Sequence, residues 1–408
     1  MSEELMSRTA AGLAEAPSER IVSDDDPSRS GRWLANPGFG VYVHIPFCAH
    51  RCGYCDFNTY EGLDHLHEPY AGALVEEIER VSGDFPAVTS VFFGGGTPTL
   101  LPAESLNRIL AAIRKRFGLA PVAEVTAEVN PETVDERKFE ALLAGGFNRF
   151  SVGVQSLSPQ VLRRLGRTHS FDRALRALAD ARRAGVEDLN ADLIYGSPWE
   201  SDGDWLHSLE GVLAAGVDHV SAYALTVEKG TPLHTLVRTG RAPDVDPDIQ
   251  AARHGTAEEV LAKAGFGRYE ISNWCTPGRA SRHNLLYWSA GDYAAFGAGA
   301  HGHASGRRYW KLRLPRDYVA AVEQGSSTDA GDEQVEDRGA EALMLGLRLS
   351  SGIDEATFAR RFGRGALESR SRRIAALCDD GLLVRRDRWL AVPPGAVLLT
   401  NEVLARLL

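Results

Sequence analysis

The chain of 408 residues contains no apolar run as long as the roughly 18 residues that a membrane-spanning helix needs. Its first 36 residues lack the apolar stretch of a signal peptide, so export is not expected. It has only five cysteines, and three of them lie within eight residues, unlike the even set of a disulfide framework. An excess of basic residues is also missing, because the net charge is −10, which argues against broad nucleic-acid binding. These absences indicate a cytoplasmic protein.

The remaining composition is that of an ordinary globular protein, with 44% hydrophobic and 25% charged residues. A chain of this length is too large to fold around one small hydrophobic core, so a large domain and a smaller one are expected. No internal repeat or low-complexity tract is evident. We expect a flexible leader at 1–36, a barrel at 37–245, a barrel extension at 246–325 and a helical domain at 326–408.

Short β-branched or aromatic runs alternate with amphipathic segments over the expected barrel region. This alternation predicts a parallel sheet with helices outside it. Six repeats favour a partial (β/α)6 barrel over a closed eight-fold one, although periodicity alone does not separate an open barrel from a doubly wound sheet. The predicted strands are 38–45, 88–93, 123–129, 149–154, 188–195 and 219–226.

The pattern changes after residue 227. Residues 230–247 are rich in turn formers, 266–310 are rich in aromatics and glycine, and 325–331 read as a linker. Helices are predicted at 249–264, 336–349, 354–362, 365–378 and 401–407, with short strands at 382–384 and 389–392. The C-terminal helices and short strands are typical of a winged-helix module.

Cys48, Cys52 and Cys55 follow the first predicted strand with the spacing CxxxCxxC. Four thiolates normally hold a 4Fe–4S cubane, so three leave one iron open for another ligand. Gly53 lets the backbone turn around such a cluster without a Cβ clash. A zinc site usually shows a second Cys/His pair further along, and His65 and His67 follow only ten residues on, in a helix-like segment. The cysteine pattern therefore favours an iron–sulfur site.

Glycines and polar residues stand where successive predicted strands end. The run GGGTP at 94–98 follows the second strand, and three glycines expose backbone to a ligand that comes close. Glu128, Gln155 and Asp192 end the next three strands, and Arg167 lies just beyond the fourth. Each could be only a cap or loop residue, but together they indicate a pocket at the strand ends.

The motif YVHIPFC at 42–48, together with the CxxxCxxC spacing, resembles the cluster loop of the radical S-adenosylmethionine (SAM) enzymes of the HemN/HemW branch. That branch contains oxygen-independent coproporphyrinogen III oxidases and haem chaperones. The resemblance implies a 4Fe–4S cluster on the three cysteines, with SAM bound to the open iron. It also implies reductive cleavage of SAM to methionine and a 5′-deoxyadenosyl radical. The implied SAM pocket comprises Tyr42, Gly95, Gly96, Thr97, Glu128, Gln155, Arg167, Asp192 and Ala224.

A second motif runs from 281 to 288 and reads SRHNLLYW. A histidine among aromatics is often a satisfied core residue, but an imidazole with flat rings beside it also suits haem. The run HNxxYW is similar to the haem-binding motif of HemW chaperones, which implies haem contacts from His283, Tyr287 and Trp288. His301 and His303 are alternative ligands, and Cys275 is a further candidate thiolate.

Two details favour the chaperone over the oxidase. The oxidases carry another cysteine in CxxxCxxCxC where this chain has Phe57, and their longer ordered N-terminal segment is replaced here by a polar leader. We therefore expect a protein that passes haem to apo-proteins such as respiratory enzymes, with coproporphyrinogen III oxidation as the alternative. The resemblance also calls for an electron donor and is compatible with a homodimer and weak membrane association.

Nucleic-acid binding through the C-terminal region is a third interpretation. Residues 354–408 contain ten arginines and seven acidic residues in a winged-helix-like pattern. A solvated face gives the same composition, and the whole chain is acidic. No nucleic-acid partner is therefore expected.

Overall fold

The computed structural model describes residues 30–408. They form two compact units. The first, here called the sheet unit, comprises Gly38–Ala264 and Asp292–Gln334. The second, called the helical unit, comprises Gly265–Gly291, Val335–Leu408 and the described part of Met1–Pro37.

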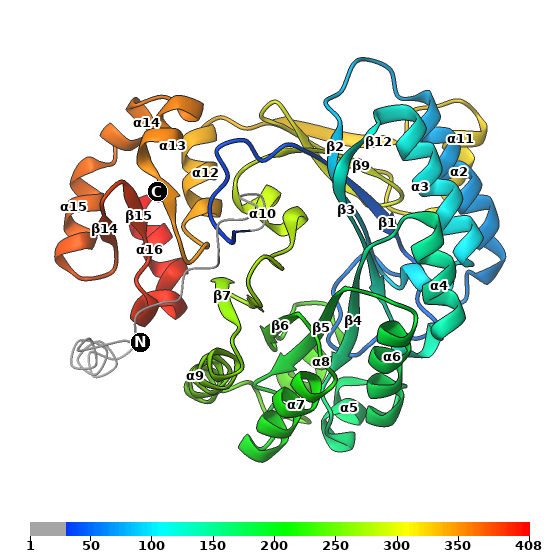
Figure 1. The fold of residues 1–408 in the computed structure, drawn as a ribbon, viewed down its shortest axis with the longest axis horizontal. Helices are drawn as coiled ribbons and strands as arrows, with labels where there is room; N and C mark the ends of the chain where they lie inside the picture. Colours follow the sequence, from blue (N-terminus) through cyan, green and yellow to red (C-terminus); the bar gives the residue numbers. More distant parts are fainter. Residues whose placement is uncertain (1–29) are drawn as a thin grey trace. The chain divides into compact units, whose positions relative to one another are not determined.

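The sheet unit contains the six predicted strands, each parallel to the next in chain order (Figure 1). Their apolar side chains are buried, as expected for strands covered on one face by helices. The strands are β1 (Phe39–Ile45), β2 (Val88–Gly95), β3 (Leu119–Val129), β4 (Arg149–Gln155), β5 (Asp188–Tyr195) and β6 (His219–Ala224).

Four further strands extend this sheet beyond β1. They are β9 (Asp292–Phe296), which is parallel to β1, and the antiparallel β10 (His301–Ala304), β11 (Arg307–Lys311) and β12 (Asp329–Gln334). None of these four strands is among those that the sequence predicts, and β12 overlaps the predicted linker. Short strands with polar residues on exposed positions carry no clear period, so their pairing is decided by neighbours.

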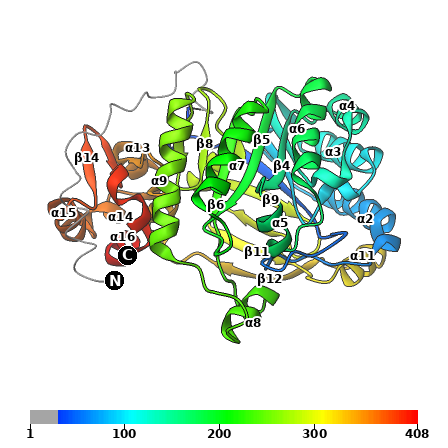
Figure 2. The ribbon, with the colours of Figure 1, turned by 90° about the horizontal axis from the view of Figure 1, so that it is seen from below.

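The turn-rich stretch after β6 also holds a helix that the sequence analysis did not predict, α8 (Pro232–Arg238). Thr231 caps it by accepting from the backbone N–H of His234 at 3.1 Å, and Pro232 occupies its first turn. Figure 2 shows α8 projecting from the strands of its own unit. A cap and a proline therefore start a helix in a segment whose composition indicated only turns.

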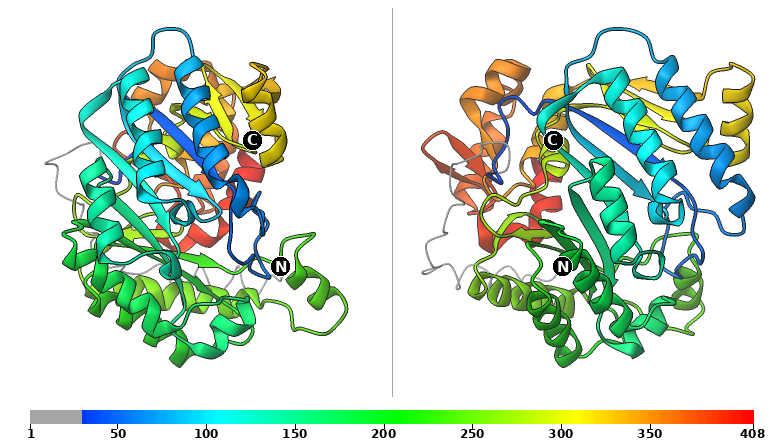
Figure 3. Two further views of the ribbon diagram at one scale, coloured as in Figure 1. Left: turned by 90° about the vertical axis from the view of Figure 1, so that its right-hand side faces the viewer. Right: turned by 45° about the vertical axis from the view of Figure 1, so that its right-hand side comes forward.

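Helices cover the outer side of the parallel strands, so the partial β/α barrel is confirmed (Figure 3). Helix α3 buries Leu106, Ile109, Leu110 and Ile113 and exposes its charged residues. The helices of this layer and its continuation are α2 (His67–Arg80), α3 (Ala103–Phe117), α4 (Glu136–Gly145), α5 (Pro159–Leu165), α6 (Phe171–Arg183), α7 (Asp202–Ala214), α9 (Pro247–Lys263) and α11 (Pro315–Glu323).

A buried carboxylate fastens the strand extension to the helix layer. Glu77 of α2 accepts from the Tyr318 hydroxyl of α11 at 2.5 Å and pairs with Lys311 of β11 at 3.0 Å. The Thr328 hydroxyl donates to the same carboxylate. A buried charge with this many partners is stabilised, whereas removing one partner would leave it uncompensated.

The helical unit has its own core, which is built mainly by the C-terminal helices. Its helices are α10 (Arg282–Trp288), α12 (Arg338–Gly346), α13 (Glu355–Phe362), α14 (Gly365–Glu368), α15 (Ser371–Asp379) and α16 (Thr400–Leu407). Its strands are the hairpin β7 (Gly267–Glu270) and β8 (Asn273–Cys275), and the small sheet of β13 (Ile353–Asp354), β15 (Trp389–Ala391) and β14 (Val384–Arg386). The predicted helix 365–378 is divided at Arg370, whose ψ of 2° departs from helical geometry. The winged-helix-like arrangement is confirmed.

Residues 30–36 differ from the flexible leader that the sequence analysis predicted. Trp33 is 4% exposed and its ring lies 6.0 Å from that of Phe358. The Arg361 guanidinium lies 4.9 Å from the Trp33 ring and donates to the Leu34 carbonyl. The rest of the predicted leader, 1–29, lies outside the described residues.

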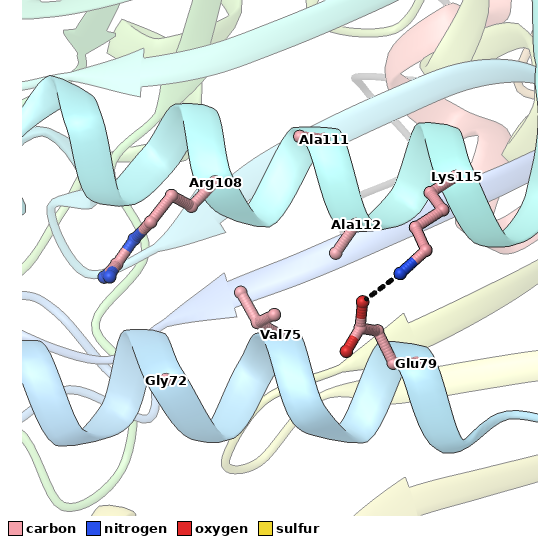
Figure 4. Close-up of a pocket in the computed structure, with 7 residues that line it drawn as sticks. All are labelled: Gly72, Val75, Glu79, Arg108, Ala111, Ala112 and Lys115. Atoms are coloured by element: carbon pink, nitrogen blue, oxygen red, sulfur yellow. Dashed lines mark hydrogen bonds and ion pairs between the residues drawn. The ribbon is translucent and has the colours of Figure 1, made fainter.

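A groove of about 350 Å³ lies between α2 and α3 (Figure 4). Its lining is Gly72, Val75, Glu79, Arg108, Ala111, Ala112 and Lys115, and Lys115 donates to Glu79 at 2.9 Å. It belongs to the helix layer and contains none of the predicted site residues. Within residues 30–408, no helix has the length and apolar character required to cross a bilayer.

We predict that Trp33→Ala lowers the free energy of unfolding of the helical unit by about 3 kcal/mol or more, because it empties a core site. Thermal unfolding followed by circular dichroism measures the change. Leu398→Ala is the control, since Leu398 lies in the same unit and is 49% exposed. Equal melting temperatures for the two variants would contradict a packed Trp33.

Candidate functional site

The three clustered cysteines lie in the loop that follows β1, and this loop is held at both ends. The Cys48 N–H donates to the Tyr60 carbonyl at 2.9 Å, and the Tyr60 N–H donates to the Pro46 carbonyl at 2.8 Å. In the middle of the loop, Gly53 donates to the Leu165 carbonyl at 3.3 Å and accepts from the Leu233 N–H at 2.8 Å. The loop that carries the thiols is therefore anchored to β1, to the end of α5 and to α8.

Two donors from outside the cysteine loop lie beside the thiols, one after β2 and one after α5. The Thr97 hydroxyl lies 3.9 Å from Cys48 Sγ, and Arg167 Nη1 donates to Cys52 Sγ at 3.4 Å. Burial raises the pKa of Cys48 to about 11 and also raises the pKa of Cys55. These thiols would be protonated without a metal, and a bound metal would displace the protons.

Among residues 30–408, no three His, Cys, Asp or Glu side chains converge on a point where a single metal ion could bind. A cubane makes a different demand, because each thiolate binds its own iron. Three cysteines in one anchored loop, with cationic and hydroxyl donors beside two of the sulfurs, fit a 4Fe–4S cluster better than a single ion.

The glycine run after β2 is joined directly to the cysteine loop. The N–H groups of Gly96 and Thr97 donate to the carbonyls of Ile45 and Phe47, each at 2.8 Å. Gly95 has a φ of +112°, and a Cβ on Gly96 would lie 2.5 Å from the Phe47 oxygen. Both positions need glycine, one for its backbone angle and one for the close approach.

Two carboxylates lie at the ends of β3 and β5. Glu128 Oε2 accepts from the Gly95 N–H at 3.1 Å, and burial together with the nearby Asp192 charge raises the pKa of Glu128 to about 8. Burial also raises the pKa of Asp192, while hydrogen bonds oppose this rise. A cation bound between these carboxylates would lower both pKa values and ionise Glu128.

Arg167, in the segment between α5 and α6, offers a further unused donor beside the end of β4. Its Nη2 donates to the Gly153 carbonyl at 3.2 Å, but its buried Nε has no hydrogen-bond partner within the described part of the chain. Nearby, Gln155 adopts a φ of +65°, which is unusual for a residue with a side chain. A carboxylate ligand would satisfy the Arg167 donor.

Tyr42 and Ala224 complete the predicted pocket. The Tyr42 hydroxyl lies 2.9 Å from His44 Nδ1, and His44 Nε2 lies 3.0 Å from the Asn58 carbonyl of the cysteine loop. Ala224 is exposed at the end of β6. All twelve predicted cluster and SAM residues thus lie in the sheet unit, in β1–β6 or in the segments that connect these strands.

Several residues that support this site were missed in the sequence. Ser151, Asn190 and Ser221 form a polar row across β4, β5 and β6. Ser151 Oγ donates to Asp192 at 2.9 Å, and Asn190 Nδ2 donates to Asp192 at 2.7 Å and to Ser221 at 2.9 Å. The signal available was a polar residue at every second position of otherwise buried strands.

The predicted haem residues lie in the helical unit, on α10. His283 is 1% exposed, and its Nε2 lies 2.9 Å from the Tyr287 hydroxyl. Burial lowers the pKa of His283 to about 3, so its imidazole is neutral at physiological pH. Trp288 is half-buried, with the Arg348 guanidinium 6.0 Å from its ring. Cys275 is buried in the core of the same unit.

Residues 42–211 match the Radical SAM superfamily, and residues 334–399 match the HemN C-terminal domain. The chain is 42% identical over 380 residues to the heme chaperone HemW of Mycobacterium tuberculosis (strain ATCC 25618 / H37Rv), which covers 91% of this chain and 95% of that protein. It is 32% identical over 368 residues to the heme chaperone HemW of Bacillus subtilis (strain 168), which covers 89% of this chain and 97% of that protein.

Among solved structures, coproporphyrinogen III oxidase (HemN) from Escherichia coli aligns with a TM-score of 0.79 over 98% of each chain, at 19% identity. At that identity the likeness establishes a shared fold. The sequence matches extend over nearly the whole length of both HemW relatives and include the cysteine loop. The chain therefore belongs to the HemW family of the radical SAM superfamily.

Proposed function

We propose that this protein is a haem chaperone that binds haem, a 4Fe–4S cluster and SAM, and delivers haem to apo-proteins such as respiratory enzymes. The observation that carries the proposal is the near full-length match to relatives named heme chaperones. The HNxxYW run on α10 and the anchored three-cysteine loop support it.

Cys48, Cys52 and Cys55 would hold the cluster. When bound, the cluster supplies an electron for the reductive cleavage of SAM. The Arg167 Nε would pair with the SAM carboxylate, and Glu128 and Asp192 suit its ammonium group and ribose hydroxyls. The glycines and Thr97 would bring bare backbone against the ligand, with Tyr42, Gln155 and Ala224 completing the pocket. We also propose that an electron donor reduces the cluster and that the protein forms a homodimer.

His283 would be an axial haem ligand. Its low pKa keeps the imidazole neutral, which coordination to iron requires. Its Nε2 is engaged by the Tyr287 hydroxyl, so coordination through that atom must displace this contact. Haem binding at α10 therefore requires a local rearrangement that frees His283 from its buried position.

Coproporphyrinogen III oxidation is the alternative activity, because the HemN enzyme shares the fold. Anaerobic assay of the reconstituted protein with coproporphyrinogen III separates the two functions. Decarboxylated product at each turnover would favour the oxidase, and haem transfer to an apo-acceptor without such product would favour the chaperone.

We predict that Cys52→Ser abolishes retention of the cluster, since two thiolates and a weaker oxygen ligand remain. Iron content and visible absorption after anaerobic reconstitution measure the loss. Cys378→Ser is the matched control, because Cys378 lies on α15 in the helical unit. Equal iron content in both variants would remove Cys52 from the ligand set.

We predict that SAM affinity increases with pH up to about pH 8 and that Glu128 contributes part of this increase. The raised pKa means that Glu128 is protonated below about pH 8, and a cationic ligand must expel that proton before it can pair with the carboxylate. The SAM amino group titrates as well, so the comparison is with Glu128→Gln. In equilibrium dialysis, the SAM affinity of the variant should depend less steeply on pH than that of the wild type. An equal slope would show that deprotonation of Glu128 does not contribute to SAM binding.

We predict that His283→Ala weakens haem binding and alters the haem absorption spectrum. Haem titration of wild type and variant, with and without the reconstituted cluster, measures both effects. His65→Ala controls for loss of an exposed histidine, since His65 lies in the short helix Asp64–Leu66. Unchanged stoichiometry and spectrum in His283→Ala would exclude His283 as a ligand.

A further inference from the structure

One face of the sheet can be followed from β1 into the strand extension through residues that stand side by side. Gly40 of β1 aligns with Tyr293 of β9, and Tyr293 aligns with His303 of β10. Tyr42 and His301 each lie two residues from Gly40 and His303 on their own strands. Side chains two residues apart on a strand share a face, so Tyr42, Tyr293 and both histidines are on one side of the sheet.

The same face carries the carboxylates of the SAM site. Tyr42 aligns with Phe92 of β2, and Phe92 aligns with Thr126 of β3, two residues before Glu128. The inner face of β9–β11, defined here by Tyr293, His301, His303, Arg308 and Trp310, is therefore continuous with the face that holds the candidate SAM pocket.

This inner face presents flat rings in cross-strand pairs. His301 aligns with Trp310 of β11, with ring centroids 6.1 Å apart and planes at 29°. Tyr293 and His303 stack at 6.5 Å and 29°. On the next strand, Gly331 aligns with Trp310, and a Cβ there would lie 2.5 Å from the indole. A glycine thus leaves the space that the Trp310 ring occupies.

The histidines of this chain that were candidate ligands differ in accessibility. His301 is exposed, whereas His303 is 9% exposed and its Nδ1 lies 3.0 Å from an oxygen of Asp292. His283 is buried on α10. Of these three, His301 offers its imidazole to a ligand without displacement of core contacts.

We propose that the inner face of β9–β11 is a second haem-binding surface, with His301 as a ligand of the iron and the edge of the Trp310 ring, which lies nearly parallel to the His301 ring, against the macrocycle. The identity of the ligand rests on the proposed chaperone function. Arg308 aligns with His303 on the same face and pairs with Glu333 at 2.8 Å, so a haem carboxylate bound there would have to compete with Glu333 for this guanidinium. Haem bound there would share one face of the sheet with SAM.

Haem titration of the reconstituted full-length protein tests this surface, with absorption and electron paramagnetic resonance as readouts. His301→Ala should weaken binding by about tenfold or more and change the axial-ligand signature, and added imidazole should restore that signature. Trp310→Leu should weaken binding more than Trp310→Phe, because phenylalanine keeps an aromatic edge toward the macrocycle and a ring beside His301. Iron content and SAM binding report whether each variant is folded. If His301→Ala does not fold, His301→Gln is titrated in its place.

His65→Ala and His283→Ala are titrated in parallel. Weakened binding in His301→Ala, with His65→Ala equal to wild type, supports the surface. If wild type binds haem and His301→Ala matches His65→Ala in affinity and spectrum, the surface is overturned while the chaperone function stands. If wild type binds no haem, the chaperone function itself fails.

Discussion

The parallel alignment of β1 with β2 is the constraint on which the site depends. It places the loop after β1 beside the glycine run after β2, where the N–H groups of Gly96 and Thr97 bond to carbonyls of the cysteine loop. Carboxyl ends of parallel strands meet at one edge, so every later strand adds its terminal residue to the same place. A side chain at Gly96 would force the two loops apart, because its Cβ would meet the Phe47 oxygen.

Burial then determines the chemistry of the residues gathered there. Burial raises the pKa values of Cys48, Cys55, Glu128 and Asp192, because their charged forms are poorly hydrated. Within residues 30–408, the Arg167 Nε has no hydrogen-bond partner. Such a set of groups is poorly compensated in the absence of ligands. Bound iron would compensate the thiolates, the cationic groups of SAM would compensate the carboxylates, and the SAM carboxylate would accept from Arg167. The polar row of Ser151, Asn190 and Ser221 holds Asp192 in place below them.

Two imidazoles with opposite surroundings belong to the two units. His283 is enclosed on α10 and bonded to Tyr287, whereas His301 is exposed beside Trp310 on the inner face of β9–β11. In the proposed chaperone function, haem must be both held and released, and two histidine ligands of unequal accessibility would suit those two tasks. Some of the arginines that suggested a nucleic-acid surface pair with acidic residues of the helical unit: Arg370 with Asp337, Arg385 with Glu355 and Arg406 with Asp380.

The sequence by itself was enough to predict the cysteine loop, the six parallel strands and the strand-end residues. These features depend on short-range residue spacing and on hydrophobic residues that recur with a period of 2 or 3.6. It did not predict β9–β12, because these short strands are specified by pairing with distant segments. It also did not predict the packing of Trp33, because the residues around Trp33 in the sequence are mostly polar. Only the tertiary structure placed Ser151, Asn190 and Ser221 against Asp192, and separated the buried His283 from the exposed His301. Burial and cross-strand alignment arise from contacts between residues that are distant in the sequence, so local sequence patterns do not predict them.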